Sequence, residues 1–330
     1  MRANELRLRL NRWLRPLDLG LYRPSVVEPK AQASSEAGGP PLPEGAEANL
    51  TPSNPAIAAL AKRYAGHPAA ALSGWSDLRL AEQVSLRWFR GESQYLYQTR
   101  GTAEASYALA AQYVARHDRL GLLDRLQEDG LFGAHTHAVD GRIVSRDLLD
   151  SILEIDALAE WMGAERLAKA RVLDIGAGYG RLVHRLCEAF PDLTAVATDA
   201  VPLSTFLCEY YLGVRGCSRA QVVPLDRADA VLSGGGFDVA VNVHSFGEAP
   251  IESVRWWIER CQAAGIPRLL LVHGTESPFA LETDLGRTPL DPELERAGYA
   301  CVDRQPKYRH SEATQRLGVF PAWYHFYEVE

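Results

Sequence analysis

The chain has 330 residues, of which 47% are hydrophobic and 23% charged, and this is the composition of a globular protein. Its formal net charge of −7 argues against general attraction to nucleic acid or to an anionic membrane. The five cysteines are odd in number and include no C-x-x-C pair, which argues against a disulfide framework and a zinc ribbon. We therefore expect a cytoplasmic protein with small-molecule partners.

The first 16 residues carry five arginines interleaved with leucines and a tryptophan. This pattern predicts a short basic amphipathic helix, and three settings for it stay open: the body of the protein, a second subunit in a homodimer, or a membrane surface. No stretch approaches the roughly 20 apolar residues that a membrane-spanning helix needs, so stable insertion is not expected.

Residues 24–55 hold seven of the 19 prolines and no aromatic residue. Such a segment buries too little to offset the entropy of ordering, so we interpret residues 1–55 as the basic helix followed by a mobile arm. Residues 56–170 follow as a helical cap for substrate binding, because apolar residues recur there three and four apart. The helical patterns cover 57–64, 78–89, 103–126 and 145–168, with no strand signal between them.

From Arg171 onward, short apolar runs alternate with helical patterns, which predicts an α/β domain over residues 171–330. Seven strands with helical crossovers form an open, mostly parallel sheet that is covered on both faces, and the last two strands form an antiparallel pair at its edge. The expected strands are 171–175, 194–198, 221–224, 237–243, 268–273, 299–304 and 323–329. The expected helices between them are 181–190, 202–212, 250–264 and 292–297.

The strongest local motif is Val-Leu-Asp-Ile-Gly-Ala-Gly-Tyr-Gly at 172–180, a buried strand that runs into three alternating glycines and a helix. Glycines permit close backbone approach to a ligand, and the helix that follows offers free N–H groups. A dinucleotide fingerprint would place a third glycine or an alanine at 181, where Arg181 stands, so NAD is not favoured.

This loop resembles motif I of the class I S-adenosylmethionine-dependent methyltransferases, whose pattern is E/D-x-G-x-G-x-G. The resemblance implies a Rossmann-like seven-stranded methyltransferase sheet behind the N-terminal helical cap, with S-adenosylmethionine as cofactor. It also implies that Asp199, at the end of the second strand, accepts hydrogen bonds from the ribose hydroxyls; alternatively Asp199 caps the helix that Pro202 opens. Asp226, after the third strand, is expected to hold the adenine amino group or to lie in a surface turn. The cofactor-binding residues are therefore predicted as Asp174, Gly176, Ala177, Gly178, Gly180, Asp199, Asp226 and Asn242.

The fourth strand ends near Val243, so the side chains that follow it are expected at the cofactor's sulfur. His244 is the expected catalytic base, since neutral imidazole accepts a proton at pH 7, and Glu248 would orient its ring. Two alternatives stay open: His244 packs under the loop, or His273 at the end of the fifth strand is the base.

Three further segments resemble the sugar O-methyltransferases of polyketide-glycoside and polysaccharide gene clusters. They are Asn-Val-His-Ser-Phe-Gly-Glu at 242–248, Phe-Arg-Gly-Glu-Ser-Gln-Tyr at 89–95 and Gly-Arg-Ile-Val-Ser-Arg-Asp-Leu-Leu at 141–149. The predicted substrate-binding residues are Phe89, Arg90, Tyr95, Ser245 and His273. A buried structural ion pair is the alternative for Arg90. His135 and His137 could supply half of a metal site, but no third ligand stands at a telling distance, so no metal is predicted.

The sequence thus predicts an S-adenosylmethionine-dependent O-methyltransferase that acts on a hydroxyl of a small molecule or glycoside, most simply a sugar in a natural product or surface glycan. Methylation of a non-sugar hydroxyl, amine or carboxyl is the alternative among enzymes. A cofactor-binding regulatory protein without catalysis is the alternative outside them.

Overall fold

The computed structural model describes residues 41–71, 75, 84–91, 93–98 and 104–329. All of them belong to one compact unit that begins at Pro40. No helix among these residues is both long enough and apolar enough to cross a bilayer. The predicted basic helix at residues 1–16 lies outside the described residues.

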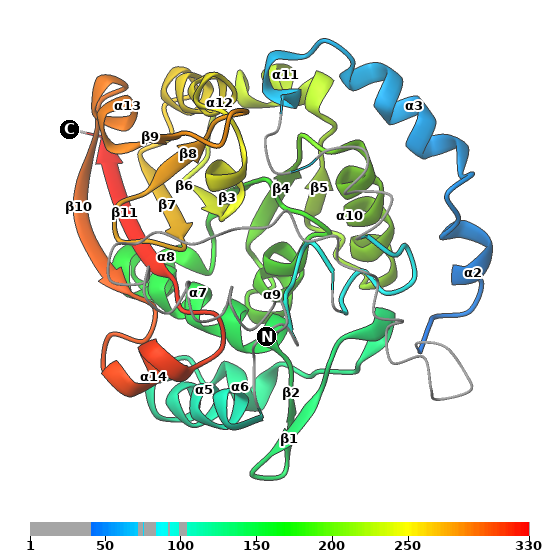
Figure 1. The fold of residues 1–330 in the computed structure, drawn as a ribbon, viewed down its shortest axis with the longest axis vertical. Helices are drawn as coiled ribbons and strands as arrows, with labels where there is room; N and C mark the ends of the chain where they lie inside the picture. Colours follow the sequence, from blue (N-terminus) through cyan, green and yellow to red (C-terminus); the bar gives the residue numbers. More distant parts are fainter. Residues whose placement is uncertain (1–40, 72–74, 76–83, 92, 99–103, 330) are drawn as a thin grey trace, which may run out of the picture. The chain divides into compact units, whose positions relative to one another are not determined.

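A seven-stranded sheet forms the centre of the fold (Figure 1). Five strands run parallel, and β11 lies antiparallel between β7 and the edge strand β10, as the sequence predicts. The spatial order is β10-β11-β7-β6-β3-β4-β5, so the order reverses beside β3, where β6 and β4 flank it. The strands are β3 (Arg171–Ile175), β4 (Thr194–Thr198), β5 (Ala220–Val222), β6 (Val239–Val243), β7 (Arg268–His273), β10 (Tyr299–Pro306) and β11 (Trp323–Val329).

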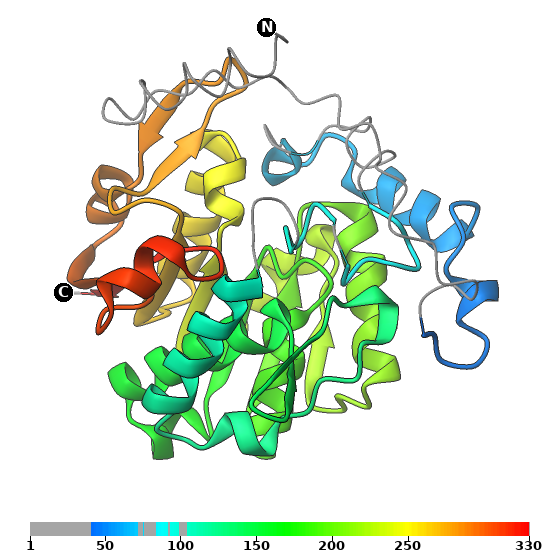
Figure 2. The same cartoon turned by 60° about the horizontal axis from the view of Figure 1, so that its bottom comes forward.

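Helices cover both faces of this sheet (Figures 1 and 2). One layer contains α7, α9 and α10, and the other contains α11, α12 and α13. The central strands are buried on both sides, which explains why their sequences are continuous apolar runs. The helices are α7 (Arg146–Met162), α8 (Ala164–Leu167), α9 (Arg181–Ala189), α10 (Pro202–Val214), α11 (Ala228–Leu232), α12 (Ile251–Ala263), α13 (Asp291–Arg296) and α14 (Glu312–Leu317), with short 3-10 turns at η4 (Leu225–Arg227) and η5 (Ser245–Glu248).

The region before β3 is largely helical, but less regular than the sequence predicts. Its helices are α2 (Ala46–Asn49), α3 (Pro55–Tyr64), α5 (Glu104–His117) and α6 (Leu122–Arg125), with 3-10 turns at η2 (Pro68–Ala70) and η3 (Leu131–Gly133). Within the predicted helix 78–89, the described residues 84–89 form bends and turns instead. A hairpin of β1 (His137–Val139) and β2 (Arg142–Val144) also interrupts this region. A second hairpin, β8 (Phe279–Leu281) with β9 (Arg287–Pro289), lies between β7 and α13. A strand of three residues is too short to show the alternating pattern from which strands are predicted. The predicted domain bounds at 56–170 and 171–330 stay a prediction.

In its second half, the proline-rich arm is packed on the core, whereas the sequence predicts a mobile segment. Residues 24–40 lie outside the described residues, but 41–55 include α2, and the side chains of Ala46 and Leu50 are buried in the hydrophobic core. A leucine packed in this way anchors the chain that precedes α3. We therefore expect a truncation at Asn54 to remove core contacts as well as an exposed segment.

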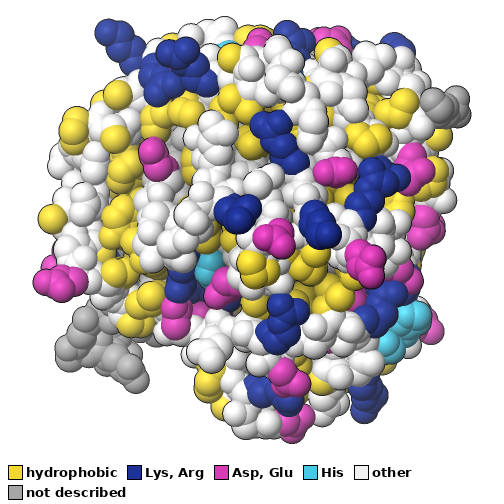
Figure 3. Space-filling view, turned by 180° about the vertical axis from the view of Figure 1, so that it is seen from behind, with side chains coloured by type: hydrophobic (Ala, Val, Ile, Leu, Met, Phe, Trp, Pro, Cys, Tyr) yellow, Lys and Arg dark blue, Asp and Glu magenta, His cyan; other side chains and the backbone are white. Residues whose placement is uncertain are grey.

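Acidic and basic side chains lie next to one another on the face drawn in Figure 3. Among the described residues, ion pairs between such side chains include Arg119 with Asp156 and Arg255 with Glu293. The two signs of charge are thus mixed on this face rather than gathered in separate patches.

Candidate active site

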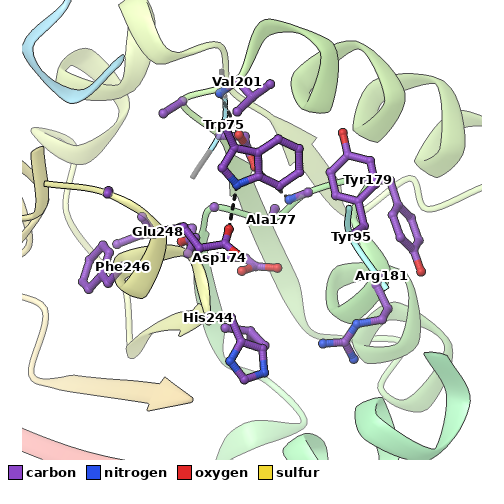
Figure 4. Close-up of a pocket in the computed structure, with 18 of the residues that line it drawn as sticks. Trp75, Tyr95, Asp174, Ala177, Tyr179, Arg181, Val201, His244, Phe246 and Glu248 are labelled. Atoms are coloured by element: carbon purple, nitrogen blue, oxygen red, sulfur yellow. Dashed lines mark hydrogen bonds between the residues drawn. The ribbon is translucent and has the colours of Figure 1, made fainter. Parts of the chain in front are cut away.

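A pocket opens at the carboxyl ends of β3, β4 and β6, beside the reversal of strand order where open α/β sheets bind ligands. It encloses about 1070 Å³, including its opening to solvent. Figure 4 shows residues from the cap and from the sheet edge pointing into it together. Among the residues that line it are Trp75, Tyr95, Arg146, Asp150, Asp174, Gly176, Ala177, Gly178, Arg181, Asp199, His244, Ser245 and Glu248.

The glycine loop between β3 and α9 needs glycine for steric reasons that the structure makes specific. Gly176, Gly178 and Gly180 all have positive φ, at 73°, 58° and 86°. A Cβ at Gly176 would lie 2.0 Å from Ser245 Oγ, one at Gly178 would lie 3.2 Å from the Tyr95 ring, and one at Gly180 would lie 2.9 Å from Cys208 Sγ. The loop is therefore packed between the end of β6, the cap and α10, and it still exposes Gly176 to Gly178 to the pocket.

Asp199 lies at the end of β4 and faces the same loop. Its Oδ2 accepts a hydrogen bond of 2.9 Å from Gly178 N, and its Oδ1 accepts one of 2.7 Å from Val201 N. Asp199 does not cap α10, because Val201 is the N-cap residue and α10 has no side-chain cap hydrogen bond. Each carboxylate oxygen of Asp199 keeps a second lone pair, and its predicted role at the ribose stays a prediction. Burial raises the pKa of Asp199 to about 7, against the opposing effect of these backbone bonds.

Asp174, in β3, is also buried and lines the pocket. Burial raises its pKa to about 7, and Arg181 opposes this only in part. Burial destabilises the ionised form of both carboxylates. A ligand that brings hydrogen-bond donors or positive charge would stabilise that form, so the pocket favours such a ligand.

Asn242 supports the loop from behind and does not line the pocket. Its side-chain amide donates to Ile175 O at 2.9 Å and to Ser245 Oγ, while its Oδ1 accepts from Phe246 N at 3.0 Å. Asn242 is fully buried, so the prediction that it contacts the cofactor is wrong. Ser245 does line the pocket, although its hydroxyl also donates to Ile175 O at 3.3 Å.

His244 follows β6 with a positive φ of 65°, an uncommon conformation for a non-glycine residue. Its ring lies edge-on to Phe320, with ring centroids 5.1 Å apart, and faces the pocket (Figure 4). Burial, reinforced by the nearby charge of Arg146, lowers its pKa to about 3. The imidazole is therefore neutral throughout the physiological pH range.

Glu248 lies in the pocket, and its Oε2 accepts a hydrogen bond of 2.6 Å from Trp75 Nε1 (Figure 4). The charges that act most strongly on His244 are those of Arg146, His273, Asp150 and Lys307, so the predicted orienting role of Glu248 has no support in this geometry. The Trp75 ring lies 5.2 Å from that of Tyr95, whose hydroxyl bonds to Ser204 Oγ at 2.9 Å. These two rings form an aromatic wall over the glycine loop, and both line the pocket. The substrate-binding role of Tyr95 stays a prediction.

Two other predicted residues lie away from the pocket. Asp226 forms a two-pronged ion pair with Arg63 of α3, at 2.7 and 3.0 Å, which corrects the prediction that it holds a ligand. His273 lies beneath η5, where a Cβ on Gly247 would come within 2.7 Å of its Nε2, and its Nδ1 accepts from Thr275 N. Burial lowers its pKa, and it does not line the pocket, so it is neither the base nor a substrate ligand.

Phe89 and Arg90 are buried below the pocket and do not line it, which corrects their assignment to the substrate. The Phe89 ring stacks on Phe132 with centroids 4.7 Å apart. The Arg90 guanidinium pairs with Glu128 and Asp147 at 2.9 and 3.0 Å. The alternative interpretation of Arg90 as a structural ion pair is therefore the correct one.

Sequence reasoning missed Arg146 and Asp150, four residues apart at the start of α7, which line the pocket opposite the sheet. It also missed Trp75 from the cap. The segment at 141–149 does contain Arg146, and an arginine four residues before an aspartate was the available signal for an ion pair. No group of three or more His, Cys, Asp or Glu residues within the described ranges is arranged to hold a metal ion.

No protein-family model matches the chain. In sequence, the chain is 34% identical over 79 residues to the type II methyltransferase M.XamI of Xanthomonas campestris pv. amaranthicola. That match covers 24% of this chain and 15% of the relative, so the similarity is confined to a small part of that protein.

Several solved methyltransferase structures are similar in part. The mitomycin 7-O-methyltransferase is 18% identical, with a TM-score of 0.39 and 56% of each chain covered. The magnesium protoporphyrin IX methyltransferase of Synechocystis PCC 6803, solved with bound S-adenosylmethionine, is 15% identical with a TM-score of 0.41, over 69% of this chain and 100% of that one. The strand order and the pocket at the carboxyl edge give this chain the Rossmann-like seven-stranded fold that its sequence predicts.

Proposed function

We propose that this chain is an S-adenosylmethionine-dependent O-methyltransferase that acts on a hydroxyl of a small molecule, in the first instance a sugar of a glycosylated natural product or surface glycan. One observation carries the proposal. The glycine loop after β3 and the carboxylate of Asp199 after β4 line a single pocket at the reversal of strand order.

The residues of this pocket fit the cofactor. The backbone from Gly176 to Gly178 lines the pocket and would contact its amino acid part, and Asp199 retains lone pairs for the ribose hydroxyls. Asp174 and Asp199 are buried carboxylates whose raised pKa values suit a ligand that is cationic and rich in donors. When bound, the cofactor supplies a methyl group on a sulfonium centre.

The pocket also suits an acceptor ring that carries hydroxyl groups. Trp75 and Tyr95 offer aromatic faces, on which the C–H surface of a sugar can pack. The Glu248 carboxylate, held by the Trp75 indole, is an acceptor for hydroxyl donors. This combination favours a sugar over a purely apolar acceptor.

His244 is the residue we propose to take the proton. When the bound cofactor methylates the acceptor hydroxyl, the proton of that hydroxyl would become strongly acidic and would pass to the neutral imidazole nitrogen of His244. A weakly basic imidazole is sufficient at that stage. Because the pKa of His244 is lowered to about 3, its titration should leave the rate unchanged between pH 5 and 8. An unperturbed histidine would instead give a rise near pH 6 to 8.

The test is release of S-adenosylhomocysteine from purified protein with a panel of acceptors: free sugars, glycosides, phenols, amines and carboxylic acids. Turnover with sugars or glycosides, lowered roughly 10²- to 10⁴-fold in kcat by His244→Ala with cofactor affinity retained, is the expected result. Turnover confined to another acceptor class would replace the sugar assignment. Cofactor binding without turnover on any acceptor would indicate the regulatory alternative.

A further inference from the structure

A buried basic cluster, made of Arg146, Asp150 and Lys307, forms the wall of the pocket beside His244. Arg146 and Asp150 come from the first two turns of α7, and Lys307 follows β10. Arg146 Nε donates to Asp150 Oδ2 at 3.1 Å, and Lys307 Nζ donates to Asp150 Oδ1. Arg146 and Asp150 line the pocket, so the cluster is in reach of a bound molecule.

The hydrogen bonds of Arg146 leave one end of its guanidinium available. Nε is taken by Asp150, and Nη1 donates to Tyr97 O at 2.9 Å. Among the described residues, Nη2 donates to none, although Arg146 is only 3% exposed. The guanidinium is held firmly, since its Cζ also lies 3.8 Å above the centre of the Phe320 ring. Nη2 is therefore a fixed donor on a buried side chain that borders the pocket.

Asp150 is shared between the two basic side chains of the cluster. Arg146 and Lys307 both donate to its carboxylate, and the other acceptors of Lys307 are the neutral carbonyls of Val319 and Phe320. Burial lowers the pKa of Lys307, so Arg146 is the permanent cation of the cluster. The next carboxylate along α7, Glu154, is paired with Arg181 at 2.9 Å. His244 across the Phe320 ring is neutral. Arg146 is thus a buried cation whose Nη2 has no acceptor among the described residues, and a buried donor without a partner is costly unless a ligand accepts from it.

We propose that Arg146 Nη2 binds a carboxylate of a molecule held in the pocket. A carboxylate accepts charge-assisted hydrogen bonds from guanidinium N–H groups, such as the one that Arg146 Nη2 offers to the pocket. Two molecules could bring it: the cofactor, through its amino acid part, or an acceptor such as a uronic acid. The inference rests on the proposed function, since it takes its ligands from there.

The cofactor arm of the test uses S-adenosylhomocysteine and its decarboxylated counterpart, titrated calorimetrically into wild type and Arg146→Gln. If Arg146 binds the cofactor's carboxylate, wild type prefers S-adenosylhomocysteine over the decarboxylated compound by on the order of 10- to 100-fold, and Arg146→Gln loses that preference. Arg255→Gln is the matched control, because Arg255 forms surface ion pairs with Glu252 and Glu293 and does not line the pocket.

The acceptor arm titrates sodium glucuronate and glucose into protein saturated with S-adenosylhomocysteine. If the acceptor brings the carboxylate, wild type prefers glucuronate, Arg146→Gln does not, and the cofactor arm shows no change in preference.

Comparison of paired ligands separates binding from folding. A merely structural role for Arg146 would weaken both members of a pair equally, and that result overturns the proposal, as does an unchanged preference in both arms. Arg146→Lys, which retains a cation next to Asp150, provides a second variant if Arg146→Gln unfolds. Failure of wild type to bind S-adenosylhomocysteine at all would instead refute the proposed function.

Discussion

Arg90 and Arg146 are both buried arginines paired with aspartates of α7, yet they differ in what surrounds them. All three nitrogens of the Arg90 guanidinium donate to protein: Nε to Asp147, Nη1 to Asp129 and to Leu131 O, and Nη2 to Glu128. Arg185 pairs with Asp147 as well, so this cluster is closed on itself. Arg146 lies one residue before Asp147 and borders the pocket, and its Nη2 has no acceptor among the described residues.

Neither residue type nor burial separates the two arginines. They differ in how many guanidinium nitrogens already donate to protein acceptors: an arginine with all of them bound stabilises the fold, and one with a free N–H can bind a ligand. Burial opposes ionisation of Asp147, but Arg90 and Arg185 hold its pKa well below its usual range. The Asp147 carboxylate and its arginines are thus bound to one another and are not available to a ligand.

The largest expected effect is on stability, from Arg90→Met. Removing this guanidinium leaves Asp147 and Glu128 short of a buried partner, which should cost about 3–5 kcal/mol of unfolding free energy. Denaturant unfolding measures it, with Arg255→Met as the surface control, expected to cost about 1 kcal/mol or less. If Arg90→Met has normal stability but no longer binds the acceptor, Arg90 is a substrate-binding residue rather than a structural one.

A second prediction concerns cofactor access at Gly178. Valine there would have to adopt a φ of 58° and would press on the Tyr95 ring. Affinity for S-adenosylmethionine should fall by about 2 kcal/mol, or roughly 30-fold. Gly213→Ala is the control, since Gly213 lies within α10 with no atom within 4 Å of the added Cβ. Equal calorimetric affinities for both variants would contradict the loop's assignment.

A third prediction is the pH dependence of cofactor affinity. Asp174 and Asp199 have pKa values raised to about 7 by burial, and a ligand that donates hydrogen bonds to them favours their ionised forms. Binding below pH 7 must therefore release protons, and affinity should rise about tenfold or more from pH 6 to 8. Calorimetry in buffers of different ionisation enthalpy measures the release. Proton uptake on binding would contradict this sign.

The smallest effect is expected for Asp226→Asn. Asp226 pairs with Arg63 at a partly exposed position outside the pocket, so the change should alter stability by about 1 kcal/mol or less and leave cofactor affinity unchanged. A clear loss of S-adenosylmethionine affinity would restore the role that the sequence indicated.

The sequence predicted those parts of the fold that depend on local patterns of apolar and polar residues. β3, β4, β7 and β11 have the expected bounds, because continuous apolar runs between glycines or polar turns mark buried strands. The two small hairpins lack such runs. In the site, the glycine loop and Asp199 follow predicted strands, and both line the pocket. Trp75 and Arg146 reach the pocket from the cap, and no local pattern specifies which face of a cap meets a sheet edge.

The same limit explains the errors at Phe89, Asn242 and His273. Each lies next to a functional segment in sequence, but its side chain points into the interior, where Asn242 and His273 hold neighbouring loops in place. Proximity in sequence predicts the neighbourhood of a side chain and leaves its direction to tertiary packing.

The most direct test of the account is a calorimetric titration of S-adenosylmethionine into wild type, Asp199→Ala and Asp229→Asn. Asp229 is the control carboxylate, paired with Arg260 on the surface away from the pocket. The account predicts saturable 1:1 binding to wild type, unchanged in Asp229→Asn and weaker by about 2–3 kcal/mol in Asp199→Ala, because bonds to two hydroxyls are lost. Equal affinity in all three folded proteins, or no binding to wild type, would contradict it.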